Sequence, residues 1–293
     1  MKPCAFDYAA PATITEAARL LDTHADGAKL IAGGQSLAPA LNFRLASPRL
    51  LIDLNRIPAL SGIVRRDDGS WRAGAMTRHR AFERSTLVAG LAPLVHAVMP
   101  SIAHVQIRNR GTIGGSLAHA DPAAEWPALC LACEAELTLT SVDGSRDLPA
   151  DSFSRGVFST ALMPNEILSA IRFPAWPATR RWGFQEIARR HGDFALAGVM
   201  CTVDLDDTRR CAAARIVVFG VADKPTLVPE ASAVLTGRLP DLALAREAGR
   251  IARARIVPRG DLHASAAYRA ELVDVLTRRA LVQAFALAER AAA

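Results

Sequence analysis

Over the first 55 residues, stretches with apolar residues at the three- to four-residue spacing of a helix alternate with short continuous apolar runs, which predicts alternating helices and strands. Thr13 and Glu16 have the spacing of a capping box, so we expect a helix that opens here and ends at Gly27. Leucines at helical spacing predict a second helix: Leu37, Leu41 and Leu45. Short apolar runs predict strands at residues 29–32 and 50–54. Residues 1–55 therefore read as a small unit of helices and strands.

The next part of the chain, residues 56–176, mixes strand and helix patterns. Asp67-Asp68-Gly69 predicts a hairpin turn, and helical patterns follow at residues 77–86 and 90–103. Asp121-Pro122 has the residue types of a helix N-terminus, so we expect a helix to open there. Apolar runs at residues 137–140 and 167–171 predict two further strands.

The last part, residues 177–293, follows a stretch typical of a linker, Phe173-Pro174-Ala175-Trp176-Pro177-Ala178, because its prolines disfavour helices and interior strands. Strands are predicted at residues 182–188, 197–205 and 214–221, and helices at 241–255 and 266–291. Strands followed by helices indicate the α+β class, with an antiparallel sheet in this part.

The composition excludes several classes of protein. A net charge of +6 and a pI near 9.5 would suit nucleic-acid binding, but the arginines are scattered in twos and threes without interleaved aromatic residues, so we expect no nucleic-acid partner. No apolar run is long enough for a membrane span, and the first residues do not resemble a secretion signal, which favours the cytoplasm. Five scattered cysteines argue against a disulfide framework, and we interpret Cys130 and Cys133 as core residues.

Candidate chemistry is concentrated in two glycine-rich turns, Ala32-Gly33-Gly34-Gln35-Ser36 and Thr112-Ile113-Gly114-Gly115-Ser116. Glycine lets backbone approach a ligand closely and adopt positive φ, so successive N–H groups can point at one anion. Two such turns could hold the two phosphates of a dinucleotide, although either one alone is more simply interpreted as an ordinary tight turn. A nucleophile elbow, a Walker loop, a zinc-protease motif and a complete GxGxxG motif are absent from the sequence, and no residue is assigned a catalytic role or a metal.

Longer stretches around both turns resemble a known family. The run from Ala32 to Leu37, with Arg44-Leu45, Pro48 and Leu51-Ile52-Asp53-Leu54, resembles the first flavin-binding stretch of the FAD subunits of molybdenum hydroxylases. The run from Gln106 to Pro122, QIRNRGTIGGSLAHADP, resembles the second stretch and is highly specific. Arg189-Arg190-His191-Gly192-Asp193-Phe194-Ala195 and Ser265-Ala266-Ala267-Tyr268-Arg269 also resemble family features, and the likeness extends from about Phe6 to Leu281.

This resemblance implies FAD in this chain, shared by the N-terminal unit (1–55) and the middle unit (56–176) and followed by the C-terminal domain (177–293). It implies a large molybdenum-pterin subunit that oxidises the substrate and a small subunit with two-iron two-sulfur clusters that passes electrons to FAD, in a dimer of heterotrimers. The implied cofactor contacts are Leu30, Ile31, Ala32, Gly33, Gly34, Gln35, Ser36 and Leu37 on one side of the diphosphate and Thr112, Ile113, Gly114, Gly115 and Ser116 on the other. Further implied contacts are Ile102, Ala103 and Leu168 at the nucleotide, Phe194 near the isoalloxazine ring, Glu125 and Gln185.

Two positions depart from the family pattern. Glu125 stands where relatives usually have an aspartate that hydrogen-bonds the cofactor, so that contact is expected to be displaced by one methylene. Near Gln185 and Glu186 many relatives carry a lysine that reaches toward the flavin. Because a nearby cation stabilises the reduced, anionic flavin, we expect its loss to lower the two-electron potential.

Two alternatives remain open at this point. A self-contained flavoprotein oxidase with the same FAD-binding fold would bind its own substrate, and a scaffold subunit would have lost the cofactor. The organic substrate, the external electron acceptor and the ability to hold FAD without partner subunits are also undecided by the sequence.

Overall fold

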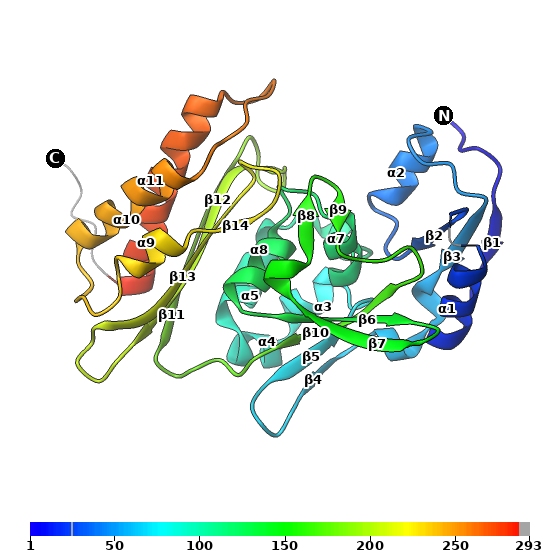
Figure 1. Cartoon of the computed structure of the whole chain (residues 1–293), viewed down its shortest axis with the longest axis horizontal. Helices are drawn as coiled ribbons and strands as arrows, with labels where there is room; N and C mark the ends of the chain where they lie inside the picture. The colour runs from blue at the N-terminus through cyan, green and yellow to red at the C-terminus, as the bar shows by residue number, and fades with distance from the viewer. Residues whose placement is uncertain (25, 287–293) are drawn as a thin grey trace.

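Three β-sheets, each formed by a different part of the chain, define the architecture of the computed structural model, which describes residues 1–24 and 26–286. The N-terminal sheet lies at one end of an elongated molecule, a second sheet lies in the middle, and the C-terminal sheet with its helices lies at the other end (Figure 1). The α+β class expected from the sequence is confirmed.

The N-terminal sheet is parallel, with strand order β1-β3-β2. Its elements are β1 (Asp7–Ala9), α1 (Ile14–Thr23), β2 (Ala28–Ile31), α2 (Leu37–Asn42) and β3 (Leu50–Asp53). The capping box is confirmed, since the Thr13 side chain accepts from the Glu16 N–H and the Glu16 carboxylate accepts from the Thr13 N–H. Two predicted ends were too long: α1 stops at Thr23 and not at Gly27, and α2 stops before Leu45, which is 82% exposed.

The middle sheet is antiparallel, with strand order β4-β5-β10-β6-β7. Its strands are β4 (Ile63–Arg65), β5 (Trp71–Gly74), β6 (Glu136–Ser141), β7 (Gly144–Pro149) and β10 (Ile167–Phe173), with a two-stranded ribbon of β8 (Ser154–Gly156) and β9 (Ser159–Thr160) beside it. Its helices are α3 (His79–Arg84), α4 (Thr86–Leu91), α5 (Pro93–Val98), α6 (Val105–Arg108), α7 (Ile113–His119) and α8 (Glu125–Ala132). Short 3₁₀ turns connect elements at Leu54–Arg56, Pro58–Leu60, Met99–Ser101 and Ala150–Ser152.

β10 joins two cores. Ile167 packs into the apolar core of the N-terminal unit together with Met76, whereas Ile171 and Phe173 belong to the core of the middle unit. Phe173 stacks on Trp71 with ring centroids 4.1 Å apart. A central strand that is covered on both faces needs apolar residues throughout, which is why residues 167–171 are apolar in nearly every position.

Two helix predictions in the middle unit were wrong in detail. The helix expected over residues 90–103 is broken, because Pro93 opens a new helix, α5, and α4 ends at Leu91. Asp121-Pro122 does not open a helix: the Asp121 carboxylate accepts from the Ala123 N–H at 2.9 Å in a turn, and α8 begins at Glu125.

The C-terminal sheet is antiparallel, with strand order β11-β12-β13-β14. Its elements are β11 (Arg180–Ala188), β12 (Ala195–Leu205), β13 (Cys211–Phe219), β14 (Thr226–Leu227), α9 (Pro229–Ala233), α10 (Leu242–Arg255) and α11 (Ala266–Phe285). The three predicted strands and two long helices are confirmed within the described residues, and the part of the second helix predicted beyond residue 286 lies outside them.

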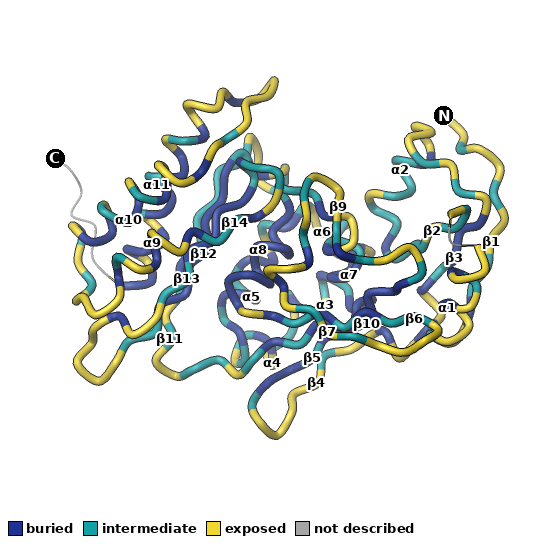
Figure 2. Tube along the Cα trace, viewed as in Figure 1, coloured by how far each residue is buried: buried dark blue, intermediate teal, exposed yellow. Residues whose placement is uncertain are grey.

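β12, a central strand of this sheet, is buried along most of its length and is dark blue there in Figure 2, so its side chains are covered on both faces. Along β12, Val199 and Cys201 pack against α10 and α11, while Met200 packs into the core of the middle unit. The alternation of side chains along a strand therefore separates a helix face from a face that turns toward the middle unit.

Cys130, in α8, and Cys133, directly after its last residue, are both buried, as expected for core residues. Burial raises the pKa of the Cys133 thiol to about 12, so this thiol stays protonated at neutral pH. Among the described residues, no group of three or more histidine, cysteine, aspartate or glutamate side chains is arranged to hold a metal ion. None of the helices within residues 1–24 and 26–286 is long and apolar enough to cross a membrane.

Candidate flavin-binding site

The two glycine-rich turns lie directly against each other, although nearly 80 residues separate them in the sequence. A Cβ atom placed on Gly33 would lie 2.2 Å from the carbonyl oxygen of Arg110 and 2.8 Å from the Cα atom of Gly111. A Cβ atom on Gly115 would lie 3.4 Å from the side chain of Ala32. Backbone approaches backbone so closely that only glycine fits at Gly33.

The first turn presents a row of backbone donors. The N–H groups of Gly33, Gly34, Gln35, Ser36 and Leu37 have no protein acceptor within the described part of the chain. Gly34 adopts a φ of +73°, and α2 begins at Leu37, where N–H groups lack intrahelical partners. Five successive free donors around a positive-φ glycine form an arrangement suited to an anion such as a diphosphate.

The second turn differs from this expectation, because its N–H groups are already used. Ile113 donates to the Thr77 carbonyl, Gly114 to the Ala75 carbonyl at 2.8 Å, and Gly115 to the Thr112 hydroxyl at 3.0 Å. A Cβ atom on Gly114 would lie 2.5 Å from that of Ala75, so this glycine serves packing against β5 and its following loop. The second turn therefore contributes a rigid wall and the Ser116 hydroxyl, and not a second row of N–H donors.

A third segment, around Ile102 and Ala103, is held in a specific backbone conformation. Ala103 adopts a φ of +47°, and the buried Arg108 guanidinium donates to the carbonyls of Ile102 at 3.0 Å and Ala103 at 2.7 Å. The opposite edge of the same guanidinium pairs with both oxygens of Glu83, at 2.9 and 3.1 Å. Arg108 thus fixes the loop that the family resemblance assigns to the nucleotide.

The loop between β11 and β12 approaches this segment and carries Phe194. A Cβ atom on Gly192 would lie 2.9 Å from the Ala103 carbonyl oxygen and 2.8 Å from Nδ1 of His104. Phe194 itself is 68% exposed, which is unusual for a phenylalanine and suits a ring that meets a planar ligand. Leu168, in contrast, is only 5% exposed and lies in the core of the middle unit.

Two carboxyl groups, those of Glu125 and Glu186, lie near each other, and neither has a salt-bridge partner among the residues that the structure describes. Glu125 is 8% exposed at the start of α8, and its burial raises its pKa to about 7. Burial, together with the negative charge of Glu125, raises the pKa of Glu186 to about 8, and its buried Oε2 atom has no hydrogen-bond partner within residues 1–24 and 26–286. At neutral pH Glu186 is therefore largely protonated and uncharged.

The Gln185 side chain does not lie on the same face of β11 as Glu186. Gly183 and Gln185 lie on the helix face of β11: a Cβ atom on Gly183 would meet the Ala280 carbonyl at 1.9 Å, and Gln185 Nε2 donates to Gln283 Oε1 at 3.1 Å. Glu186 lies on the opposite face of the strand, the one that turns toward the middle unit. Of the two residues singled out in this segment, Glu186 and not Gln185 therefore faces the middle unit.

His79 and Trp126 form a buried pair behind the second turn. Trp126 Nε1 donates to His79 Nδ1 at 2.8 Å, so the proton of the neutral imidazole lies on Nε2. Burial, with the charges of Arg108 and Arg78, lowers the pKa of His79 to about 3. Gly111 packs on this ring, since a Cβ atom there would lie 2.7 Å from Nε2. Sequence reasoning did not distinguish His79 from the other dispersed histidines.

A further polar group, also not predicted, joins the two turns: Asn55 and Arg78 bond to the carbonyls of Ala32 and Arg110. The only signal in the sequence was the position of Asn55 just after the strand that follows the first turn.

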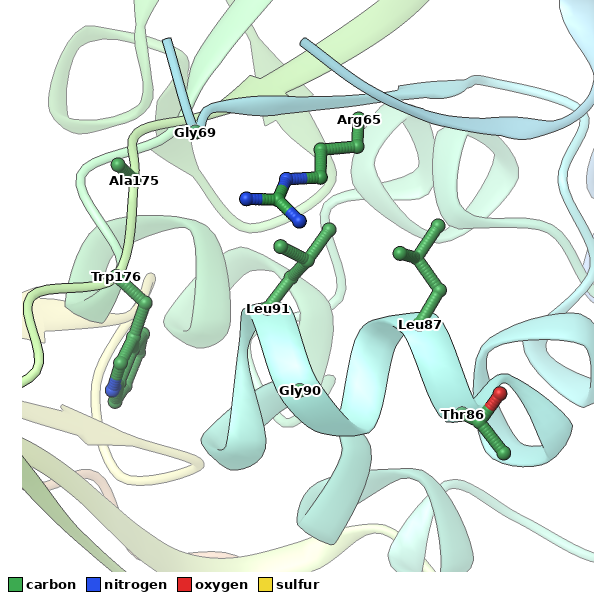
Figure 3. A pocket seen from close by; sticks show the side chains of 8 residues that line it. All are labelled: Arg65, Gly69, Thr86, Leu87, Gly90, Leu91, Ala175 and Trp176. Atoms are coloured by element: carbon green, nitrogen blue, oxygen red, sulfur yellow. The ribbon is translucent and has the colours of Figure 1, made fainter. Parts of the chain in front are cut away.

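A separate surface hollow of about 420 Å³ lies away from all these residues. Arg65, Leu87, Leu91 and Trp176 surround it, as Figure 3 shows, near the connection between the middle and C-terminal sheets. None of its lining residues belongs to the set expected to contact FAD.

Comparison with known proteins defines the class. A model of the FAD binding domain in molybdopterin dehydrogenase matches residues 4–176, and a model of the CO dehydrogenase flavoprotein C-terminal domain matches residues 182–284. The chain therefore belongs to the family of FAD-binding medium subunits of the molybdenum hydroxylases, which are oxidoreductases. The family resemblance and the FAD cofactor inferred from the sequence are confirmed.

Individual relatives match over nearly their whole length. The nicotine 6-hydroxylase medium subunit of Paenarthrobacter nicotinovorans is 42% identical over 97% of this chain and 99% of its own. The 6-hydroxypseudooxynicotine dehydrogenase complex subunit alpha of the same organism is 40% identical over 97% of this chain and 96% of its own. A solved structure of carbon monoxide dehydrogenase from Hydrogenophaga pseudoflava superimposes with a TM-score of 0.94 at 37% identity, covering 98% of this chain and 99% of that chain.

Proposed function

We propose that this chain binds FAD between its two glycine-rich turns and serves as the electron-transfer subunit of a heterotrimeric molybdenum hydroxylase. The observation that carries the proposal is the row of free N–H groups from Gly33 to Leu37, packed against the second turn, in a chain that matches medium subunits over its full length. FAD, when bound, accepts electrons from the iron–sulfur clusters of a partner subunit and passes them to an external acceptor. The protein's own contribution is to bind, orient and shield the cofactor.

Each segment has a proposed part in holding FAD. The N–H groups of the first turn bind the diphosphate, with Leu30 and Ile31 behind them, and Thr112 to Ser116 close the other side, with the Ser116 hydroxyl as a donor. Ile102 and Ala103 contact the nucleotide, with Leu168 as an apolar neighbour, and Phe194 packs near the isoalloxazine ring. We place Glu125 and Glu186 beside the cofactor and omit Gln185, because Gln185 bonds to α11.

The assembly that we propose contains a large molybdenum-pterin subunit and a small subunit with two-iron two-sulfur clusters. Support comes from the relatives, which are named as subunits of complexes, including a medium subunit. We further propose a dimer of heterotrimers located in the cytoplasm, without a nucleic-acid partner. Mass determination of the complex purified through a tag on this chain tests the stoichiometry.

For the substrate of the whole enzyme, we propose a nitrogen heterocycle oxidised in the large subunit. Two relatives at 40 and 42% identity are named for nicotine or a derivative of it, whereas the carbon monoxide dehydrogenase structure is 37% identical. Dye reduction by the purified complex with nicotine, quinoline or carbon monoxide tests this. Activity with carbon monoxide alone contradicts it.

The first experiment is a visible absorption spectrum of the purified chain, followed by analysis of the pigment after acid release. Flavin bands and release of intact FAD support the proposal, and co-purification of the two partner subunits extends it. A chain that reduces its own flavin with an organic substrate would be a self-contained oxidase. A chain that fails to take up FAD, alone or with its partners, would be a scaffold subunit.

A further inference from the structure

A chain of hydrogen bonds connects the N-terminal unit to the middle unit beside the two glycine-rich turns. Arg78, the residue before α3, donates from Nη1 to the Arg110 carbonyl and from Nη2 to Oδ1 of Asn55. Asn55, just after β3, donates from Nδ2 to the Ala32 carbonyl at 2.8 Å. Ala32 belongs to the first turn and Arg110 lies two residues before the second, so the chain of bonds connects the segments that carry the two turns.

The Arg110 carbonyl has a double role in this arrangement. It is the atom that a Cβ on Gly33 would meet at 2.2 Å, and it is also the acceptor for Arg78. The same guanidinium also donates to Asn55, which in turn donates to the Ala32 carbonyl, directly before Gly33. Arg78 therefore holds both partners of the closest approach between the two turns.

Asp53 and Tyr8 support the asparagine. One carboxylate oxygen of Asp53 accepts from the Asn55 backbone N–H at 2.8 Å and from its side chain at 2.5 Å, and the other accepts from the Tyr8 hydroxyl at 2.6 Å. Partial burial opposes ionisation of Asp53, but the hydrogen bonds from Tyr8 and Asn55 and the charge of Arg78 outweigh it and lower the pKa of this carboxyl. An ionised Asp53 fixes the orientation of the Asn55 amide, so that Nδ2 faces Ala32 and Oδ1 faces Arg78.

We propose that Arg78 is a positioning residue for the cofactor: acting through Asn55, it sets the separation of the two turns and so keeps the N–H row of Gly33 to Leu37 in place. This inference rests on the proposed function of that row. An arginine suits the task because its planar fork donates in two directions at once, whereas a lysine ammonium cannot match both directions with the same geometry.

The apolar contact between the two units is independent of this polar chain. Met76 and Ile167 of the middle unit pack into the N-terminal core without Arg78 or Asn55. Loss of Arg78 should therefore leave the fold intact and act on the local separation of the turns. That separation of effects makes the inference testable.

The test measures FAD affinity of the full-length chain by the change in flavin fluorescence, with thermal unfolding of the same samples. Arg78→Met and Asn55→Ala should each raise the FAD dissociation constant about 10- to 100-fold, since each removes hydrogen bonds to or from a charged group. Arg78→Lys should not restore binding, and the double variant should lose little more than either single one, because both act on the same element. The affinity for ADP, measured by competition, should fall in parallel. Arg172→Met is the matched control, since Arg172 pairs with Glu136 at 2.6 Å away from the turns, and should leave FAD affinity unchanged.

Other results overturn the inference in distinguishable ways. If Arg78→Met weakens FAD binding but Asn55→Ala does not, and Arg78→Lys restores it, Arg78 contacts the cofactor directly as a cation. If both variants bind FAD as the wild type does, the hydrogen-bond chain does not set the site. A wild-type chain that takes up no FAD overturns the proposed function first, and this inference with it.

Discussion

Gly33→Ala is the substitution with the most specific expected effect on FAD binding. The new Cβ atom would lie 2.2 Å from the Arg110 carbonyl oxygen, so the two turns must separate by about 1 Å to reach an ordinary contact. A hydrogen bond lengthened from about 2.9 Å by that amount is no longer effective. If two of the first-turn donors lose such bonds to a charged phosphate, the loss is about 3–6 kcal/mol, and the FAD dissociation constant rises about 150- to 25,000-fold.

The assay is a titration of the chain with FAD, followed by flavin fluorescence, together with thermal unfolding of the protein without added FAD. Gly90→Ala is the neutral control, because no atom lies within 4 Å of its added Cβ; FAD binding should not change. Gly183→Ala is the control for damage elsewhere, since its Cβ would lie 1.9 Å from the Ala280 carbonyl between β11 and α11. Gly183→Ala should lower the unfolding temperature, whereas the FAD affinity of the protein that remains folded should stay close to that of the wild type.

The contrary result is a Gly33→Ala variant that binds FAD within about threefold of the wild type, a difference below 1 kcal/mol. The close approach of the two turns would then have no role in forming the site. An effect equal to that of Gly183→Ala in both assays would point to general destabilisation.

Three further predictions concern buried charges. The pKa of Glu186 is raised to about 8, so between about pH 4.5 and 8 the folded protein without FAD binds more protons than the unfolded chain. Its free energy of unfolding should therefore fall as pH rises through this range. Denaturant titrations should show a weaker dependence of this free energy on pH for Glu186→Gln. The pKa of His79 is lowered to about 3, so here the unfolded chain binds the extra proton, and stability should fall as pH decreases from about 6.5 toward 3. His79→Phe should reduce this acid sensitivity. Because it leaves the Trp126 N–H unpaired, the same variant should lower the unfolding free energy at pH 7 by about 1–3 kcal/mol. Arg108→Met removes one of the two ion-pair partners of Glu83, which keeps Arg80 at 2.9 Å, and should cost about 1–3 kcal/mol of stability in a denaturant titration; a variant as stable as the wild type would show that the Arg108–Glu83 pair contributes nothing.

Much of the fold could be predicted from local patterns. The capping box at Thr13, the strands of the C-terminal sheet and the burial of Cys130 and Cys133 follow from residue spacing and composition, which act within a few residues of each other. Helix ends were predicted less well. α2 stops early because Arg44 adopts a left-handed conformation, and α5 is a separate helix because proline disfavours continuation of the preceding one.

The parts of the site differ in how far they could be predicted. The glycine turns carry a long family motif, so their identity and the FAD cofactor followed from the sequence. The hydrogen-bonding state of their N–H groups did not, because the acceptors for Ile113 and Gly114 are carbonyls of residues 77 and 75, more than 30 positions away. Only the fold brings those carbonyls to the second turn and leaves the first turn free.

The sequence by itself determined the class of the protein, its cofactor and most of its secondary structure, since these depend on local spacing and on motifs contained in single stretches. The tertiary structure decided which face of β11 meets the middle unit, and hence that Glu186 and not Gln185 turns toward that unit. It also decided that Arg78 and Asn55 join two turns that are distant in the chain. A strand pattern shows that alternate residues face opposite ways, but only the packing of other elements against the sheet determines which side is which.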